Sequence, residues 1–259
     1  SHVNIIRRQR HGVQDSDSQL TRKRRMISVC MATYNGEKFV CQQLRSITAQ
    51  LGTADEVIVS DDGSTDSTLA VIESMGDSRI KTIEGPRRRS PVWNFENALR
   101  HAKGDYIFLA DQDDVWKPGK VSTMMEWLKR YDCVVSDAEM ADSGLGIVNQ
   151  SYYGMHGTRP GRMYNLLVKN GYMGCCMAFT RRVLDASLPF PRNIPMHDLW
   201  IGNVAAFRFS VKFIGDRLVT YRCHGGNASF TATGKSGYSM LKKIIIRLTT
   251  AINLLAIRK

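Results

Sequence analysis

The sequence predicts an α/β domain built on a mostly parallel sheet flanked by helices. Short apolar runs alternate with segments whose apolar residues recur at helical spacing, a pattern that is typical of βαβ units. The chain of 259 residues is long enough for one large domain of this class. Polar residues cluster directly after several of the apolar runs, and sheets of this class bind ligands at the carboxyl ends of their strands.

The elements of the first half follow one another at regular spacing. Short apolar runs predict strands at residues 27–31, 56–60, 79–83, 105–110 and 133–136. Apolar residues at helical spacing predict helices at residues 37–50, 67–75, 92–101 and 117–130. Asp66 precedes the second of these helices and is expected to cap it. After about residue 138 Gly, Asn and Tyr become frequent, and we expect shorter strands and helices there.

The two ends of the chain carry most of its positive charge. Of the net charge of +12, residues 1–25 contribute +5 and residues 234–259 contribute +6, which leaves +1 for residues 26–233. Residues 1–25 lack apolar periodicity, so we expect a disordered basic arm or a foreign remnant, with Met26 as the natural start. The nearly neutral centre argues against a nucleic-acid binder, whose basic patch more often crosses the folded face.

The basic tail, residues 234–259, contains a predicted amphipathic helix. Its apolar residues fall on one helical face: Leu241, Ile244, Ile245, Leu248, Ile252 and Leu255. Such a helix either lies at a membrane interface or packs on its own domain. No run of apolar residues is long enough to span a membrane, and the six cysteines show no C-x-x-C or zinc spacing. We therefore expect a cytoplasmic protein, either free or peripheral on the inner face of the cytoplasmic membrane.

Two groups of carboxylates follow predicted strands. They are Asp61 with Asp62, and Asp111 with Asp113 and Asp114. Carboxylates this close repel one another unless a cation compensates them, and Mg²⁺ or Mn²⁺ prefers such oxygen ligands together with substrate phosphates. A cluster that caps the helix at residues 117–130 is the alternative for the second group alone. Tyr34, after the first strand, would line the same edge and stack on a nucleobase, or else belong to a simple turn.

Three motifs resemble the family 2 glycosyltransferases of the GT-A fold. They are residues 28–36 (SVCMATYNG), 59–66 (VSDDGSTD) and 104–116 (GDYIFLADQDDVW), the last of which resembles the family's D-x-D region. The resemblance covers about residues 26–230 and implies a GT-A domain at residues 26–233. Its nucleotide-binding half would span about residues 26–138, and its acceptor half about residues 139–233.

The resemblance assigns the nucleoside end of the donor to residues of the first half. Ala32 and Tyr34 would line the nucleobase pocket, and Asp62 would hydrogen-bond the base. Asn94 would also approach the donor. The arginines at residues 87–89 either contact phosphates or belong to a solvated loop.

The diphosphate end of the donor is assigned in the same way. Asp111 would lie near the ribose or the metal with Gln112 beside the donor, and Asp113 would bind the metal that bridges the diphosphate. Residues 221–229 (YRCHGGNAS) resemble the family's Y-R-x-H segment. This implies that Arg222 neutralises the leaving diphosphate and that His224 is a metal ligand or a diphosphate contact, although a lone histidine can also be structural.

The acceptor side contains the expected general base. Residues 195–200 (PMHDLW) resemble the segment that holds the catalytic carboxylate, usually an acid followed by Asp. Asp198 is expected to be the base, although it can also cap a helix, and His197 is the alternative because histidine titrates near neutrality. His197 in place of an acid resembles the rhamnosyltransferase-like branch. Residues 171–176 resemble a segment that walls the acceptor side, and a buried strand or turn fits them equally well.

The resemblance implies an inverting transfer of a sugar from a nucleotide-diphosphate donor, dTDP-rhamnose or a UDP-hexose, to an acceptor hydroxyl. The cofactor would be Mn²⁺ or Mg²⁺. The basic tail suggests a glycan or lipid-linked glycan acceptor in bacterial surface polysaccharide (O-antigen or capsule) synthesis. A sugar-nucleotide nucleotidyltransferase is one alternative, weakened because residues 32–38 hold only one glycine and one lysine. A non-catalytic nucleotide-sugar binding protein is another, weakened because Asp62, Asp113 and Asp198 are all present.

Overall fold

The computed structural model describes residues 25–224 and 239–257. Three predicted segments lie wholly or partly outside these ranges. They are the expected basic arm up to residue 24, residues 225–229 of the last motif, and the tail at residues 234–238 and 258–259. No helix in the described ranges is long and apolar enough to cross a membrane.

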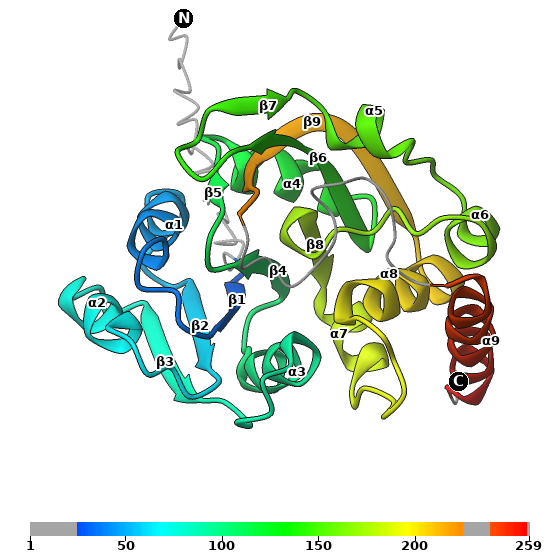
Figure 1. Ribbon diagram of the computed structural model, residues 1–259, viewed down its shortest axis with the longest axis horizontal. Helices are drawn as coiled ribbons and strands as arrows, with labels where there is room; N and C mark the ends of the chain where they lie inside the picture. The colour runs from blue at the N-terminus through cyan, green and yellow to red at the C-terminus, as the bar shows by residue number, and fades with distance from the viewer. Residues whose placement is uncertain (1–24, 225–238, 258–259) are drawn as a thin grey trace, which may run out of the picture.

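One mixed sheet carries the strands of both halves of the chain. The strands are β1 (Ile27–Thr33), β2 (Glu56–Asp61), β3 (Ile80–Glu84), β4 (Tyr106–Asp111), β5 (Val115–Trp116), β6 (Cys133–Ala141), β7 (Ile147–Asn149), β8 (Met177–Thr180) and β9 (Val211–Arg222). Their order is β3-β2-β1-β4-β8-β6-β9-β5, with β7 paired to β6. The sheet runs through the middle of the molecule and curls around α4 (Figure 1).

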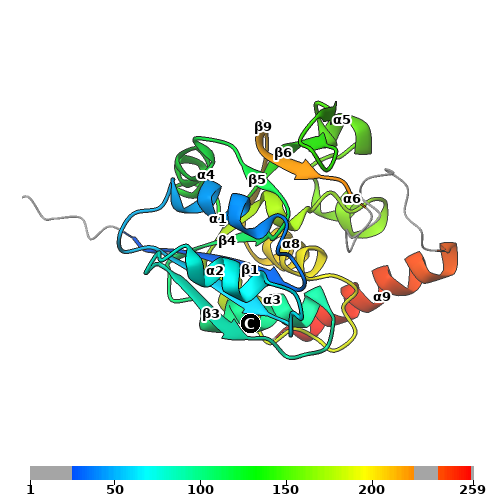
Figure 2. The same ribbon diagram turned by 60° about the vertical axis from the view of Figure 1, so that its left-hand side comes forward.

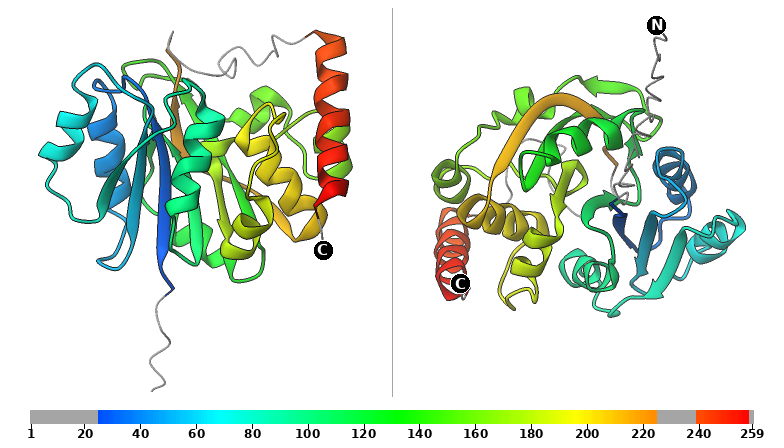
Figure 3. Two further views of the ribbon diagram at one scale, coloured as in Figure 1. Left: turned by 90° about the horizontal axis from the view of Figure 1, so that it is seen from below. Right: turned by 180° about the vertical axis from the view of Figure 1, so that it is seen from behind.

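Helices cover both faces of this sheet. They are α1 (Val40–Thr48), α2 (Thr68–Ser74), α3 (Pro91–His101), α4 (Lys120–Leu128), α5 (Tyr152–His156), α6 (Arg162–Leu167), α7 (Arg181–Ser187), α8 (His197–Arg208) and α9 (Met240–Ala256), with a 3-10 turn, η1 (Gly174–Cys176). Figures 1 and 3 show α1 and α4 on one face and α3, α7 and α8 on the other. The predicted fold class is confirmed.

The first half is built from buried parallel strands. β1, β2 and β4 are almost entirely buried, as expected for strands that are covered on both faces. The helices between them are amphipathic, and α1 buries Val40, Leu44 and Ile47 at helical spacing. The parallel pairing aligns Ala32 with Asp111 and Thr33 with Asp61, so the carboxyl ends of three strands meet at one edge. This edge holds the candidate site.

The predicted elements of the first half recur with shifted ends. The expected helix at residues 117–130 is the shorter α4, and the expected strand at 133–136 extends to residue 141 as β6. Asp66 does not occupy the cap position of α2, which is Ser67, but its Oδ1 accepts a hydrogen bond from Thr68 N. The ends of these helices and strands therefore depend on side-chain contacts that the pattern of apolar residues does not predict.

The second half differs from the first in strand direction. β8 lies between β4 and β6 and is antiparallel to both, whereas β6 and β9 are parallel. The expectation of short elements after residue 138 is wrong for α8 and β9, each of which has 12 residues. β9 is long because it pairs with β6 along its length and with β5 at its end.

The C-terminal helix α9 stands along the side of the domain, next to α6 and α8 (Figures 2 and 3). It buries only Thr250 and Leu254 among its residues. The apolar residues of the predicted face are exposed: Leu241, Ile244, Ile245, Leu248, Ile252 and Leu255. The helix thus packs through a minor face and leaves its main apolar face uncovered by the described residues.

Candidate active site

The loops after β1 and β4 are joined by a reciprocal pair of hydrogen bonds. Tyr34 N donates to Gln112 Oε1 over 3.0 Å, and Gln112 Nε2 donates to Tyr34 O over 3.1 Å. A Cβ atom at Gly36 would lie only 2.3 Å from Gln112 Oε1, so glycine leaves room for this amide. Gln112, expected to lie beside the donor, therefore fixes the backbone that presents the Tyr34 ring.

The carboxylates after β2 are also engaged with backbone. Asp61 accepts hydrogen bonds from Ser64 N and Ser64 Oγ and is buried, so it shapes the turn that follows β2. Asp62 accepts from Arg88 N at 3.1 Å and from Ser90 N at 3.2 Å. Asp62 thus ties the loop that precedes α3 to the edge of the sheet, at the position expected to face the base.

Asn94 reaches the same edge from α3. It is 3% exposed, and its Nδ2 donates to Thr33 O over 3.2 Å. Its Oδ1 is buried without a hydrogen-bond partner among the described residues. Ala32 lies one residue earlier on β1, opposite Asp111 and partly exposed.

The three arginines at residues 87–89 point to different partners. Arg87 forms an exposed ion pair with Glu84, Arg88 lies over the ring of Trp93 at 5.4 Å, and Arg89 lies over the ring of Tyr34 at 5.7 Å. Only Arg89 therefore approaches the expected nucleobase residue.

The expected metal ligands are adjacent. His224 Nε2 lies 2.8 Å from Asp113 Oδ2, and the Asp113 side chain is largely buried. At this distance the two side chains are hydrogen-bonded to each other, and they are also close enough to serve as neighbouring ligands of one cation, because ligands around an octahedral Mg²⁺ are about 2.9 Å apart. The charge of Asp113 also acts on Asp111, where burial and the charges of Asp113 and Asp198 raise the pKa to about 7.

A second, deeper cluster joins Asp111 to Asp114 and Cys175. One ligand atom from each lies within 4.8 Å of the others. Burial raises the pKa of Asp114, and a hydrogen bond with Cys176, together with burial, raises the pKa of the Cys175 thiol. A protonated thiol is a poor ligand for a hard cation, so a magnesium or manganese ion fits the Asp113–His224 side better.

Lys120 supplies a positive charge to this deeper cluster. It is fully buried, its Nζ donates to Cys175 O over 2.5 Å, and it lies 4.7 Å from the centre of the Trp116 ring. Burial lowers the pKa of its ammonium group, while the carboxylates of Asp114 and Asp111 oppose this effect. A buried charge with such partners is costly to remove.

Arg222 links the ends of β4 and β9. Its guanidinium donates from Nε to Asp113 O and from Nη2 to Gln42 Oε1, both over 2.7 Å, and lies 4.4 Å from the ring of Phe39. Its backbone N donates to Asp114 Oδ1. Arg222 is thus 3% exposed and bonded to the backbone of Asp113, an expected metal ligand, and its contact with a leaving diphosphate stays a prediction.

The expected base, Asp198, lies in the first turn of α8. Its Oδ1 accepts a hydrogen bond from Leu199 N and its Oδ2 accepts one from Gly174 N, so Gly174 of the segment at residues 171–176 contacts the expected base. Burial raises the pKa of Asp198 to about 6. Because its charge also acts on Asp111, the two carboxylates belong to one site.

His197 is placed differently from its neighbour. Its ring stacks on Phe95 with centroids 3.9 Å apart, and neither ring nitrogen has a hydrogen-bond partner among the described residues. Burial lowers the pKa of His197 to about 3. The ring is therefore neutral at physiological pH and packs between α3 and α8.

Comparison with known proteins identifies the family. The model of "Glycosyl transferase family 2" matches residues 28–188. The chain belongs to this family. Two relatives from Escherichia coli are described as UDP-Glc:alpha-D-GlcNAc-diphosphoundecaprenol beta-1,3-glucosyltransferases. WfgD is 28% identical, covering 66% of this chain and 64% of WfgD, and WfaP is 26% identical, covering 79% of this chain and 80% of WfaP.

Solved structures confirm the GT-A-like arrangement of this glycosyltransferase. Residues 1–349 of S. aureus TarS in complex with UDP-GlcNAc match with a TM-score of 0.63 at 19% identity, covering 87% of this chain and 71% of that one. The mannosyltransferase PcManGT from Pyrobaculum calidifontis in complex with GDP-Man and Mn²⁺ matches with a TM-score of 0.59 at 20% identity, covering 89% and 74%. At these identities the likeness shows the fold alone.

The sequence of this family 2 enzyme gave no indication of Lys120. It lies in a predicted helix, where a lysine is ordinarily solvated, and nothing in its spacing shows that Cys175 covers it. Asp114 was visible as one of a carboxylate group, but its burial was not. The sequence shows only that Lys120 follows Asp114 by six positions. This spacing is too common to predict that the two side chains are buried together.

Proposed function

We propose that this glycosyltransferase transfers a hexose from a UDP-sugar to a hydroxyl group of a diphosphate-linked glycan, with inversion at the anomeric carbon. The observation that carries the proposal is the position of the Asp198 carboxylate in the first turn of α8, held by Gly174 N and near enough for its charge to act on Asp111 at the end of β4. A base on the acceptor side thus faces carboxylates on the donor side.

Asp198 is the general base in this proposal. A carboxylate with a pKa near 6 is ionised at neutral pH and is more basic than an ordinary aspartate. It takes the proton of the acceptor hydroxyl as the hydroxyl oxygen attacks the anomeric carbon and the bond to the diphosphate oxygen breaks. His197 is the weaker candidate, because its ring is buried against Phe95 and its pKa is lowered to about 3.

A divalent cation fits the donor side. Asp113 and His224 are hydrogen-bonded neighbours, and burial together with the charges of Asp113 and Asp198 raises the pKa of Asp111 to about 7, which supports a cation as the group that would compensate these carboxylates. When bound, Mg²⁺ or Mn²⁺ would stabilise the charge that develops on the leaving diphosphate. Asp113 and His224 would hold it, while Arg222 keeps the loop that carries Asp113 in place.

The choice of donor and acceptor rests on the relatives. WfgD and WfaP are described as using UDP-Glc and a GlcNAc-diphosphoundecaprenol acceptor, and the TarS structure contains UDP-GlcNAc. A UDP-hexose is therefore the proposed donor, ahead of dTDP-rhamnose. We place the enzyme at the cytoplasmic face of the membrane, in the synthesis of a surface polysaccharide.

Nucleotide binding tests the donor site. UDP, dTDP and GDP are titrated calorimetrically with and without Mn²⁺ into the wild type, Asp113→Ala and the control Asp185→Ala, which changes an exposed carboxylate on α7. We expect Mn²⁺-dependent binding of UDP that Asp113→Ala loses and Asp185→Ala keeps. If dTDP binds more tightly than UDP, dTDP-rhamnose replaces the UDP-hexose as the proposed donor. Absence of binding by all three nucleotides would contradict the proposed function.

Membrane contact is proposed through the exposed face of α9. Its apolar residues are flanked by Lys242, Lys243 and Arg247, which suit an anionic lipid surface. α6 lies next to α9, where Arg247 Nη2 donates to Val168 O, and contributes further exposed apolar residues: Met163, Leu167 and Val168.

Vesicle binding tests this contact. The double variant Ile244→Ser/Leu248→Ser is compared with Leu69→Ser, an exposed leucine on α2. Since each buried aliphatic side chain contributes about 1.5–3 kcal/mol, we expect at least a tenfold loss of binding to anionic vesicles in the double variant and none in the control. Equal vesicle binding by the wild type and the double variant would contradict a membrane contact through α9.

A further inference from the structure

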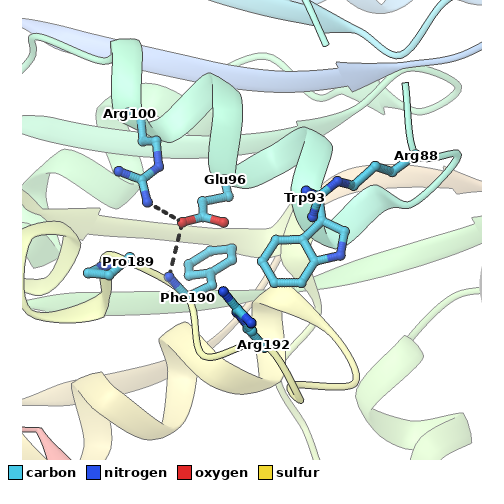
Figure 4. Close-up of a pocket in the computed structure, with 7 residues that line it drawn as sticks. All are labelled: Arg88, Trp93, Glu96, Arg100, Pro189, Phe190 and Arg192. Carbon is cyan, nitrogen blue, oxygen red and sulfur yellow. Dashed lines mark hydrogen bonds and ion pairs between the residues drawn. The ribbon is translucent and has the colours of Figure 1, made fainter. Parts of the chain in front are cut away.

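An open pocket of about 670 Å³ lies outside the carboxylate site, between α3 and the loop that precedes α8. Its lining combines arginines with aromatic and cyclic apolar side chains: Arg88, Trp93, Glu96, Arg100, Pro189, Phe190 and Arg192. Figure 4 shows Trp93, Glu96 and Arg100 projecting from α3 toward the loop with Phe190 and Arg192. None of these residues except Arg88 was singled out by the motifs.

Two of the residues that line the pocket, Glu96 and Arg100, form an ion pair with each other. Glu96 Oε1 accepts from Arg100 Nη2 over 2.6 Å and from Phe190 N over 3.1 Å (Figure 4). Glu96 is 8% exposed, so this carboxylate is committed to Arg100 and to the backbone of the loop. The pair fixes the loop against α3 and offsets the charge of one of the three guanidinium groups.

Two guanidinium groups remain without a carboxylate. Arg88 and Arg192 are both exposed, and neither forms an ion pair with any residue in the described ranges. Arg88 lies over the Trp93 ring instead. A pocket with two uncompensated guanidinium groups and an aromatic wall suits an anion carried by a saccharide or an alkyl group, because guanidinium binds phosphate oxygens in bidentate fashion and the ring contacts apolar faces.

The pocket adjoins both parts of the active site. Arg88 belongs to the loop that Asp62 holds at the donor edge. Phe95, between the pocket residues Trp93 and Glu96 on α3, stacks on His197, next to the expected base. The helix α3 and the loop before it thus carry both residues of the pocket and residues that contact the candidate site.

We propose that this pocket binds the phosphate or diphosphate group of the acceptor, through Arg88 and Arg192 with Trp93 as the apolar wall. The assignment of the anion to the acceptor rests on the proposed function, since a diphosphate-linked glycan presents such a group beyond its sugar. The pocket would then select acceptors by their anionic aglycone, separately from donor binding.

Matched acceptors test the pocket. Two substrates carry the same sugar, one on a short alkyl diphosphate and the other on a neutral alkyl chain. The variants are Arg88→Ala and Arg192→Ala, and the control is Arg130→Ala, whose exposed guanidinium also lies over an indole ring, that of Trp127. We expect each pocket variant to raise KM for the diphosphate acceptor roughly tenfold, with unchanged KM for the donor and for the neutral acceptor. Arg130→Ala is expected to change none of these values.

Two results would overturn the proposal: an unchanged KM for the diphosphate acceptor in both pocket variants, or an equal rise for both acceptors. Calorimetric titration of the short alkyl diphosphate in the presence of saturating UDP separates this site from the transfer reaction. Binding that Arg192→Ala weakens supports the pocket even if no sugar transfer is detected, in which case only the proposed function fails. Absence of binding, or binding that UDP displaces, assigns the anion to the donor site and overturns the pocket.

Discussion

The expected donor side and the expected acceptor side of the site both anchor polar groups on backbone, but with different results. At the ends of β1 and β2, Asp62 and Asn94 bond to backbone, and Gln112 pairs with the backbone of Tyr34. On the other side, Asp198 also accepts hydrogen bonds from two backbone N–H groups, yet burial raises its pKa to about 6. The groups after β1 and β2 therefore hold a fixed geometry, whereas the acceptor side holds a carboxylate that is more basic than an ordinary aspartate.

Removing the reactive group gives the largest expected effect. Asp198→Asn retains the size of the side chain but cannot take a proton, so we expect kcat to fall by about 10³-fold. Nucleotide binding should not change, because Asp198 lies on the acceptor side. Transfer rates and calorimetric UDP binding are measured on the same preparation, and circular dichroism checks the fold. A variant with near-normal kcat would show that another group takes the proton.

The buried charge of Lys120 gives the next effect, on stability. Lys120→Met removes a buried ammonium group that donates to Cys175 O and whose charge acts on Asp114 and Asp111, and we expect a loss of roughly 3 kcal/mol in the free energy of unfolding. Lys129, which is exposed at the C-terminal end of α4, provides the control, with an expected change below about 1 kcal/mol for Lys129→Met.

The double variant Lys120→Met/Asp114→Asn sharpens this comparison. If Lys120 compensates Asp114, removing both charges should recover part of the lost stability in a urea-unfolding cycle. Strictly additive losses would mean that Lys120 stabilises the fold through packing alone.

The acceptor half also predicts a pH dependence. A base must be ionised, so kcat/KM should rise about tenfold per pH unit up to the pKa of about 6 and level off above it. Among the described residues, the charge of Asp198 acts on Asp111, with a pKa raised to about 7, and on Tyr152, whose pKa burial raises above its usual range. An Asp111→Asn profile that keeps its inflection near pH 6 assigns it to Asp198, whereas loss of that inflection assigns it to Asp111.

The fixed geometry of the donor half gives the smallest effect. Gln112→Ala removes the paired hydrogen bonds to the Tyr34 backbone, and Gly36→Ala should do the same by displacing the Gln112 amide. We expect both to raise the donor KM by about tenfold or less with little change in kcat. A change confined to Gln112→Ala would show that this side chain contacts the donor directly.

The same contrast explains what the sequence could predict. β1, β2 and β4 are buried parallel strands, so their apolar runs and the polar residues at their ends were visible as local patterns. β9 has no clean alternation of buried and exposed residues, because it pairs with β6 through irregular register and reaches β5 at its end. It was therefore missed.

Side-chain surroundings were the least predictable part. The motif around His197 indicates a residue beside the base, but its stacking on Phe95 joins segments about a hundred residues apart. Arg222 likewise donates a hydrogen bond to Gln42, a residue that lies near the other end of the domain in the sequence. The exposure of the apolar face of α9 could not be predicted either, since the same periodicity serves a helix packed on its domain.

The hydrogen bonds between Gln112 and residue 34 involve only the main chain of residue 34. The loop therefore keeps its course whatever aromatic or polar side chain stands at that position. The support of the loop is thus separate from the identity of the side chain at position 34, so with Tyr34 as the proposed nucleobase residue we expect that base preference can be changed while the loop keeps its backbone. A library at position 34 with Gln112 and Gly36 kept unchanged is the natural route to altered nucleotide selectivity in this enzyme.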